Sequence, residues 1–315
     1  MEQHSERQFD YAAVRAAADR IAGGIRPVAV APAAEGLWYA LEHLQHTGSF
    51  KARGALNFLA AHHAAGTLPV AGVTIASGGN AGLACAWAAR THAVPATVFL
   101  PENAPRVKVE RLRGYGARVR LAGDRYAEAQ AACQEFAASS GALSSHAYDH
   151  PLVAAGAGTL LDEIRAALPG LDTVVVAVGG GGLLAGIATA AREQGVHVVA
   201  AEPENSRALN AALAAGRPVD VPVDSVAADS LGATRVSADA LAAARAAHVE
   251  SVLVPDAAVT AARRTLWEEH RIVVEAAAAT ALAALQAAPR PPGERVAVVL
   301  CGANTDPADL AAPAA

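Results

Sequence analysis

The sequence predicts an α/β fold built from parallel βαβ units, and three observations support this prediction. Short apolar segments with the period of a strand alternate with segments of about ten residues that have the period of a helix. Glycine-rich turns lie where an apolar strand passes into its helix. In addition, a chain of 315 residues with 53% hydrophobic content can bury a large core.

The first half of the chain begins this alternation. The period over 11–22 predicts a weakly amphipathic helix, and the run Leu-Trp-Tyr-Ala-Leu at 37–41 predicts a short strand before a polar turn. Further strands are expected at the apolar runs 70–76, 96–100 and 116–121. Helices are expected at 50–63, 83–90, 105–113 and 125–138.

The second half repeats the same order of elements. Strands are expected at 173–178, 196–201 and 295–300. Helices are expected at 156–168, 183–193, 206–215, 238–247, 257–270 and 276–287. Residues 216–235 contain proline and aspartate at intervals that indicate a loop.

Composition excludes several classes of protein. A net charge of -5 gives no electrostatic reason to bind nucleic acid or an anionic membrane. No apolar run is long enough to span a membrane, and the N-terminus lacks a basic region followed by an apolar one. Three widely spaced cysteines, Cys85, Cys133 and Cys301, argue against a disulfide framework and against a zinc cluster. We therefore expect a cytoplasmic globular protein.

Lysine is rare in this chain. Only Lys51 and Lys108 are lysines among 25 basic residues, and the others are arginines. A lysine that persists against this bias is a candidate for amine chemistry, because arginine stays protonated and cannot form an imine. For Lys108 the ordinary interpretation, a helix-surface cation, is preferred.

Three segments lie where a strand passes into a helix: Gly48–Gly54, Ser77–Gly82 and the four glycines Gly179–Gly182. Ligands of open α/β sheets bind at such turns, and bare backbone N–H groups at a helix start can hold a phosphate or a carboxylate. Each segment also has an ordinary interpretation. The glycine run is compatible with a tight turn or a partial dinucleotide fingerprint, Ser77–Gly82 with a capping turn, and Lys51 with a solvated surface lysine.

Taken together, these segments resemble the fold-type II family of pyridoxal phosphate (PLP) enzymes that includes serine and threonine dehydratases, within the tryptophan synthase β-like superfamily. The residues Leu41–Ala55, LEHLQHTGSFKARGA, look like the lysine motif of that family almost residue for residue. The similarity extends through about 37–304. Shorter matches to the family are Pro105–Lys108, Tyr115–Ala117, Asp149–Pro151 and Gly156–Thr159.

The resemblance implies PLP as cofactor and a role for individual residues. Lys51 would be the Schiff-base lysine and would remove the Cα proton of the substrate. Phe50 would lie against the pyridine ring, Asn80 would hydrogen-bond its 3-oxygen, and Cys301 would lie beside its nitrogen as a neutral thiol. Residues that would hold the phosphate are Gly179, Gly180, Gly181 and Gly182. Residues that would line the substrate carboxylate site are Ser77, Gly78, Gly79 and Ala81.

The resemblance also implies an arrangement of domains. Two open, twisted, mostly parallel α/β domains would enclose the cofactor in the cleft between them. The large PLP-binding domain would consist of 1–50 and 151–315, and the small α/β domain of 51–150. The family also suggests a homodimer.

Three positions depart from relatives within the family. Racemases of this family carry a second serine where this chain has Gly78, and glycine cannot supply the second acid or base that racemisation needs. Ala81 replaces the histidine of many threonine dehydratases. Ala208 replaces the aspartate of members that bind a divalent ion, so no divalent metal is expected, whereas Glu202 could bind a monovalent cation.

The expected function is therefore PLP-dependent dehydration and deamination of L-serine, L-threonine or both, which gives a 2-oxo acid and ammonia. An alternative is β-elimination or β-replacement on another amino acid, such as 3-hydroxyaspartate, phenylserine or an O-acylserine. Racemisation is disfavoured by Gly78. The alternative from another class is a metabolite-binding protein without catalysis.

Overall fold

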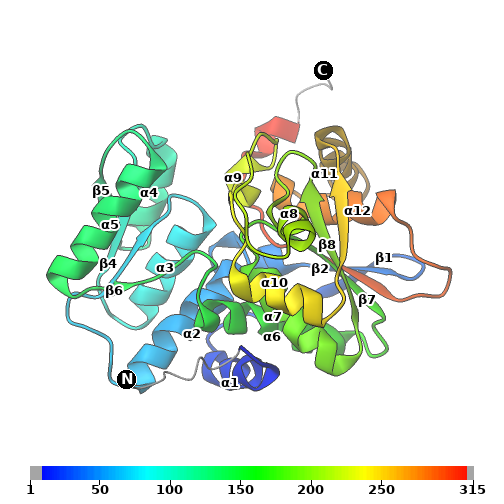
Figure 1. The fold of residues 1–315 in the computed structure, drawn as a ribbon, viewed down its shortest axis with the longest axis horizontal. Helices are drawn as coiled ribbons and strands as arrows, with labels where there is room; N and C mark the ends of the chain where they lie inside the picture. Colours follow the sequence, from blue (N-terminus) through cyan, green and yellow to red (C-terminus); the bar gives the residue numbers. More distant parts are fainter. Residues whose placement is uncertain (1–8, 311–315) are drawn as a thin grey trace.

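The computed structural model describes residues 9–310, which contain two β-sheets (Figure 1). The larger sheet consists of β1 (Val30–Ala34), β2 (Leu37–Ala40), β7 (Thr173–Ala177), β8 (His197–Pro203), β9 (Glu250–Val254) and β10 (Val296–Val299). The smaller sheet consists of β3 (Val73–Ala76), β4 (Ala96–Leu100), β5 (Arg118–Leu121) and β6 (Leu143–Ser144). Their orders are β1-β2-β10-β7-β8-β9 and β5-β4-β3-β6.

Nearly all neighbouring strands in these two sheets are parallel. Only β1 and β2 pair antiparallel among the described residues, at the edge of the larger sheet. The pairs β2–β10, β10–β7, β7–β8 and β8–β9 are parallel, and so are β3–β4, β3–β6 and β4–β5. The predicted α/β fold with mostly parallel sheets is therefore confirmed.

Helices connect the strands and cover the sheets. The α-helices that precede β7 are α1 (Tyr11–Ile21), α2 (Lys51–Ala64), α3 (Asn80–Thr91), α4 (Arg106–Gly114), α5 (Tyr126–Ser140) and α6 (Pro151–Ala167). Those that follow it are α7 (Gly182–Gln194), α8 (Ala208–Ala215), α9 (Ala228–Leu231), α10 (Ala238–Ala246), α11 (Asp256–His270) and α12 (Ala276–Ala287). Three short 3₁₀ helices are η1 (Glu42–Leu44), η2 (His46–Gly48) and η3 (Pro307–Leu310).

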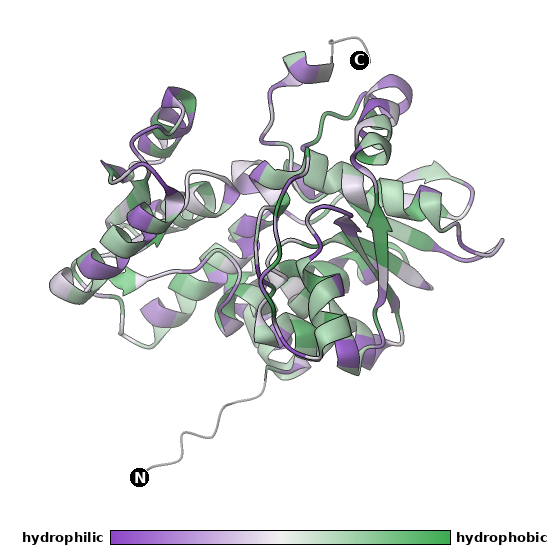
Figure 2. Cartoon of the chain, turned by 45° about the horizontal axis from the view of Figure 1, so that its top comes forward, coloured by the Kyte–Doolittle hydropathy of each residue, from purple (hydrophilic) through white to green (hydrophobic). Residues whose placement is uncertain are grey.

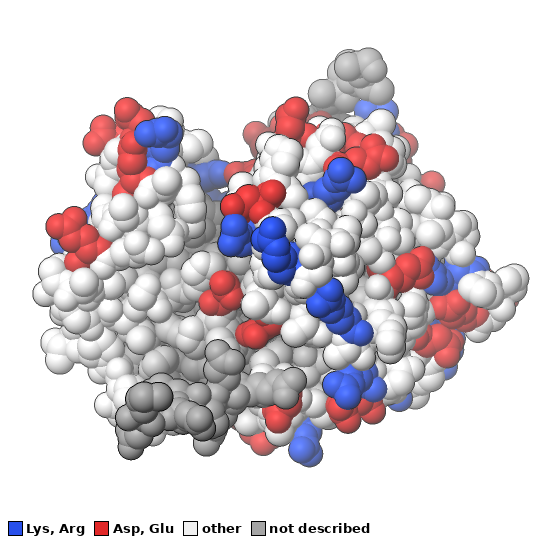
Figure 3. Space-filling model, in the orientation of Figure 1, with Lys and Arg blue, Asp and Glu red and all other residues white. Residues whose placement is uncertain are grey.

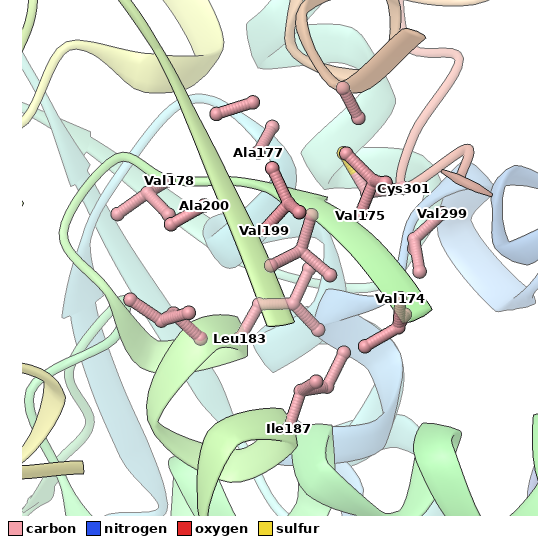
Figure 4. Close-up of a cluster of buried hydrophobic side chains, with 14 of the residues drawn as sticks. Val174, Val175, Ala177, Val178, Leu183, Ile187, Val199, Ala200, Val299 and Cys301 are labelled. Atoms are coloured by element: carbon pink, nitrogen blue, oxygen red, sulfur yellow. The ribbon is translucent and has the colours of Figure 1, made fainter. Parts of the chain in front are cut away.

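The main hydrophobic core lies on the larger sheet. Every residue of β7 is buried, as expected for a parallel strand that is covered on both faces. Figure 4 shows Val174 and Val175 of this strand with Leu183, Ile187 and Val199 in one apolar cluster. In Figure 2, which colours residues by hydropathy, the strands of the larger sheet are mostly in the hydrophobic colour.

Helices α2 and α7, which both begin at the cavity described below, pack closely against α6. A Cβ atom on Gly54 of α2 would lie 2.6 Å from the carbonyl oxygen of Val153 in α6. Likewise, a Cβ atom on Gly186 of α7 would lie 2.3 Å from the carbonyl oxygen of Ala154. These distances are too short for any side chain, so α2 and α7 lie against α6 backbone to backbone.

A buried ion cluster fixes α2 further. The guanidinium of Arg53 is fully buried and contacts Glu42 at 2.6 Å and Glu163 at 2.6 Å. It also donates to the hydroxyl of Thr159 at 3.2 Å. Because a buried charge that loses its partner is costly, this cluster restrains the helix at whose first turn Lys51 lies.

Some elements differ from the prediction. The strands β1, β6 and β9, the helix α9 and the 3₁₀ helices were not expected, and α6 begins at Pro151 rather than at 156. His150 explains the earlier start, because its Nδ1 accepts the N–H of Leu152 and so caps the helix, and proline fits the first helical position. Across residues 9–310, no helix has the length and apolar character needed to cross a membrane.

Candidate active site

A cavity of about 530 Å³ lies at the carboxyl ends of β3, β7 and β10, between the two sheets. Figure 3 shows a notch between the two parts of the molecule, and on this face acidic and basic side chains are interspersed. The cavity brings together all the predicted site residues except Glu202. It is lined by Phe50, Lys51, Ser77, Gly78, Gly79, Asn80, Ala81, Gly179, Gly180, Gly181, Gly182 and Cys301, together with residues that were not predicted.

The side chain of Lys51 reaches this cavity from the first residue of α2. Its Nζ donates to the carbonyl oxygen of Ala147 at 2.7 Å and lies 4.8 Å from the ring centre of Phe50. Burial lowers the pKa of Lys51 to about 8, although Cys301 and Glu275 oppose this shift. The amine is therefore neutral in an appreciable fraction of molecules near neutral pH, which a nucleophile or a base requires.

The four-glycine turn follows β7 and leads into α7. Gly181 has φ of 93°, in the left-handed region that favours glycine. A Cβ atom on Gly180 would lie 2.3 Å from the ring of Tyr148, so side chains are excluded here by space as well. The first N–H groups of a helix have no acceptor inside the helix, so this turn can hold a phosphate at the positive end of α7.

The turn after β3 forms the facing side of the cavity. The Gly79 N–H donates to the Oγ of Ser77 at 3.4 Å, and α3 begins at Asn80 without a side-chain cap. Nothing lies within 4 Å of the place where a Cβ atom of Gly79 would be. This more open backbone, with a serine hydroxyl and a helix start, suits a carboxylate.

Glu275 is a site residue that the sequence analysis missed. Its side chain is 6% exposed, lines the cavity and accepts a hydrogen bond from Nδ2 of Asn80 at 2.7 Å. Burial raises the pKa of Glu275 to about 7, against the opposing effect of the Asn80 hydrogen bond. A signal was present in the sequence: Glu275 directly precedes an alanine-rich helix. Because such a helix is buried, its neighbouring carboxylate had to be buried too and needed a partner.

Cys301 follows β10 and joins the core of the larger sheet. Figure 4 shows it in the same apolar cluster as Val175 and Val299. Burial raises the pKa of the Cys301 thiol, with a further contribution from Glu275. The thiol is therefore neutral at ordinary pH.

Lys108, predicted to be a helix-surface cation, lies on α4 and forms an ion pair. Its Nζ contacts Oδ1 of Asp229 at 2.5 Å, and both residues line the cavity. The side chain of Lys108 is 33% exposed and that of Asp229 is 72% exposed. The ion pair joins α4 of the smaller sheet to α9 in the loop 216–235, a long-range contact that helix periodicity cannot reveal.

Glu202, the candidate cation ligand, lies outside the cavity. Its two carboxylate oxygens accept the N–H groups of Leu209 at 2.7 Å and Asn210 at 2.8 Å, so Glu202 caps α8. Burial raises the pKa of Glu202 to about 7. Within residues 9–310, no group of three His, Cys, Asp or Glu side chains is arranged to hold a metal ion.

The sequence matches a known family and several known proteins. The family model for pyridoxal-phosphate dependent enzymes matches residues 24–302. The chain belongs to this family. The L-threonine ammonia-lyase of Geobacter sulfurreducens is 40% identical over 251 residues, which are 79% of this chain and 62% of that protein. The human serine dehydratase-like protein is 37% identical over 84% of this chain and 83% of its own length.

A solved structure agrees with this membership. Maize serine racemase superimposes with a TM-score of 0.88 and 26% identity, covering 96% of each chain. Pyridoxal phosphate is the cofactor of the family, and the residues of this chain fit it. The glycine turn leaves the space that a Cβ atom would fill, and the amine of Lys51 faces the same cavity.

Proposed function

We propose that this chain is a PLP-dependent ammonia-lyase that converts L-serine, L-threonine or both into a 2-oxo acid and ammonia. One observation carries the proposal. The amine of Lys51, whose pKa burial lowers to about 8, lies in one cavity with the glycine turn and the Ser77–Ala81 turn. The names of the Geobacter and human relatives agree with this substrate class.

The residues of the chain divide the work in this proposal. When bound, PLP supplies an aldehyde for a lysine amine and a ring that delocalises negative charge from Cα. The backbone N–H groups of Gly179–Gly182 hold the phosphate, and Ser77 with the N–H groups at the start of α3 holds the substrate carboxylate. The amine of Lys51 takes the proton from Cα.

The conversion of serine into pyruvate and ammonia needs no reactant other than the water that it releases and takes up again. Loss of water from Cα and Cβ of serine is followed by uptake of water when the released enamine hydrolyses, so the net products are pyruvate and ammonia. If the ring nitrogen of PLP lay beside Cys301, this neutral thiol would not hold a proton on it as a carboxylate would. Gly78 offers no acid on the opposite face of Cα, which supports elimination over racemisation.

A substrate panel tests the proposal. We expect purified protein to show a visible absorption band that Lys51→Ala removes, and serine or threonine to give 2-oxo acid and ammonia. If neither amino acid reacts while 3-hydroxyaspartate, phenylserine or O-acetylserine does, the substrate class is wrong. If the protein shows no band and binds no PLP, it is a metabolite-binding protein instead.

Other features stay predictions. A large domain of 1–50 and 151–315 and a small domain of 51–150 are supported by the sheets, since every strand of the smaller sheet falls within 73–144. A monovalent cation bound at Glu202 is a further proposal. If it is bound, activity in potassium salts should differ from activity in salts of a large organic cation. A homodimer in the cytoplasm is likewise expected, and light scattering tests the dimer.

A further inference from the structure

A directional series of hydrogen bonds joins Arg111 to Glu275 beside the cavity. A guanidinium N–H of Arg111 donates to Oδ1 of Asn304, and Nδ2 of Asn304 donates to Oδ1 of Asn80 at 2.6 Å. Nδ2 of Asn80 then donates to Oε1 of Glu275 at 2.7 Å. We call these four residues the relay, and all four line a small side cavity next to the main one.

The charges at the two ends set the direction of the relay. A guanidinium can only donate hydrogen bonds, and an ionised carboxylate can only accept them. An asparagine amide has nearly the same shape in both orientations, so its direction is decided by its partners. With Arg111 at one end and Glu275 at the other, each amide has one orientation that satisfies both neighbours. Asn80 therefore turns its NH₂ group toward Glu275.

The relay connects the two parts of the molecule. Arg111 lies on α4 and Asn80 begins α3, and both helices belong to the smaller sheet. Asn304 follows β10, and Glu275 directly precedes α12, which packs on the larger sheet. Successive members of the relay thus come from opposite sides of the cavity. Asn304 also donates to the carbonyl oxygen of Thr47 at 2.7 Å, close in sequence to Lys51.

Two glycines leave the space that the relay occupies. A Cβ atom on Gly48, whose φ is 76°, would lie 2.9 Å from Oδ1 of Asn304. A Cβ atom on Gly302 would lie 1.8 Å from Oε1 of Glu275. Side chains at these positions would displace one relay member each, so the local sequence is adapted to the relay at two separate places.

Two relay members, Asn80 and Glu275, also line the main cavity. Lys51 and Cys301 line the same cavity. Asn80 is the member whose amide can contact a ligand there. Its Nδ2 carries two hydrogens, and one of them is used by Glu275. The second is available to an acceptor oxygen on a ligand in the cavity. If the amide turned over, it would present its own oxygen there and repel the same ligand.

We propose that Arg111 and Glu275 are positioning residues that hold the amide of Asn80 with its N–H groups toward the cavity, and so determine how tightly the chain binds its cofactor. This inference rests on the proposed function, because it takes the main cavity to be the PLP site. Arg111 is exposed and lines only the side cavity, so its effect on the cofactor acts through the other members of the relay.

The first test uses Arg111→Met, which keeps most of the stem but removes the donors, and Arg111→Lys, which keeps a donor. Arg113→Met, an exposed arginine on the same helix, is the matched control. At pH 8, above the pKa of Glu275, PLP is titrated into each apoprotein and the visible band is recorded. We expect Arg111→Met to raise Kd about tenfold, the effect of one hydrogen bond, and to change the band. We expect Arg111→Lys to have the wild-type Kd and visible band, and Arg113→Met to leave both unchanged.

The second test is Asn304→Asp, which keeps the shape but replaces the donor to Asn80 with an oxygen. Asn80 then has an acceptor on each side, so neither orientation of its amide satisfies both neighbours and its N–H groups are no longer held toward Glu275. We expect a loss of about 100-fold in PLP affinity. Thermal unfolding checks that each variant is folded. Wild-type affinity and spectrum in both Arg111→Met and Asn304→Asp would overturn the relay while the proposed function stands. A wild-type protein that binds no PLP would overturn both.

Discussion

The cavity has two unlike sides, although each contains a turn between a parallel strand and a helix. On the side of the larger sheet, a Cβ atom on Gly181 would lie 2.4 Å from Ala240, and one on Gly180 would meet the ring of Tyr148. On the side of the smaller sheet, Gly79 has free space around it. At the turn after β7, glycine is required because a side chain would clash and because Gly181 has a left-handed φ. At Gly79 a side chain would have room, and glycine only leaves the backbone exposed.

The two lysines differ in the same sense. Lys51 donates to Ala147, the neighbour of the tyrosine that packs on the glycine turn, and its pKa is lowered by burial. Lys108 lies on the open side and is paired with Asp229. Burial thus changes the acid–base behaviour of Lys51, whereas Lys108 stays partly exposed and pairs with an exposed carboxylate.

The largest expected effect concerns the amine of Lys51. With a pKa of about 8, it holds about 200 times more neutral amine at pH 7 than a peptide lysine of pKa about 10.4. Labelling of the apoprotein with a small acylating reagent should therefore proceed at Lys51 with a midpoint near pH 8, as peptide mass spectrometry would measure. Lys108→Arg is the control and leaves this profile unchanged. A midpoint above pH 10 contradicts the low pKa.

The next effect is that of Gly181→Ala. The new methyl group meets Ala240 and forces a left-handed φ on alanine, so we expect a loss of about 3 kcal/mol in the free energy of unfolding. The displaced turn should also weaken PLP binding by about 100-fold, since several backbone donors move together. Denaturant unfolding and PLP titration measure the two effects. Unchanged PLP affinity would show that the phosphate is held elsewhere.

Gly82→Ala, on the side of the smaller sheet, should have a smaller effect than Gly181→Ala, because Gly82 lies inside α3 and its φ is not left-handed. A Cβ atom there would lie 1.9 Å from the carbonyl oxygen of Ser77, so the turn after β3 must shift. We expect a loss of about 2 kcal/mol in stability and a raised KM, with PLP affinity within about threefold of wild type. A strong loss of PLP affinity would mean that the two sides are not independent.

The smallest effect is expected for Gly79→Ala. Gly79 has φ of -100° and no atom within 4 Å of the new methyl group, so alanine fits without strain. Unfolding free energy should change by less than about 0.5 kcal/mol, and only KM should rise, by a few-fold, because the methyl group borders the carboxylate site. A destabilisation as large as that of Gly181→Ala would remove the contrast between the two turns.

Much of the fold followed from the sequence because its signals are local. Strand β4 and helix α12 have the expected bounds, since apolar runs bordered by turn residues and an alanine-rich run are easy to recognise. The edge strand β1 contains proline and alanine, and β9 begins with a glutamate, so neither has a typical strand pattern. The order of strands depends on contacts between distant segments, which periodicity does not contain.

The site divides in the same way. The glycine turn and the segment around Lys51 could be recognised because their function is carried by consecutive residues. Glu275, Asn304 and Asp229 could not, because their roles arise from partners such as Asn80 and Lys108, which lie more than 100 residues away in the chain. Buried polar groups need partners, but the sequence does not say which ones.

The position of β10 has a consequence for the synthesis of this protein. β10 lies between β2 and β7 in the middle of the larger sheet, yet it is formed by residues 296–299. While the chain leaves the ribosome, β2 and β7 therefore wait beside an open gap, with apolar edges that invite wrong pairing. The strands of the smaller sheet all lie within residues 73–144, so they leave the ribosome far earlier than β10 does.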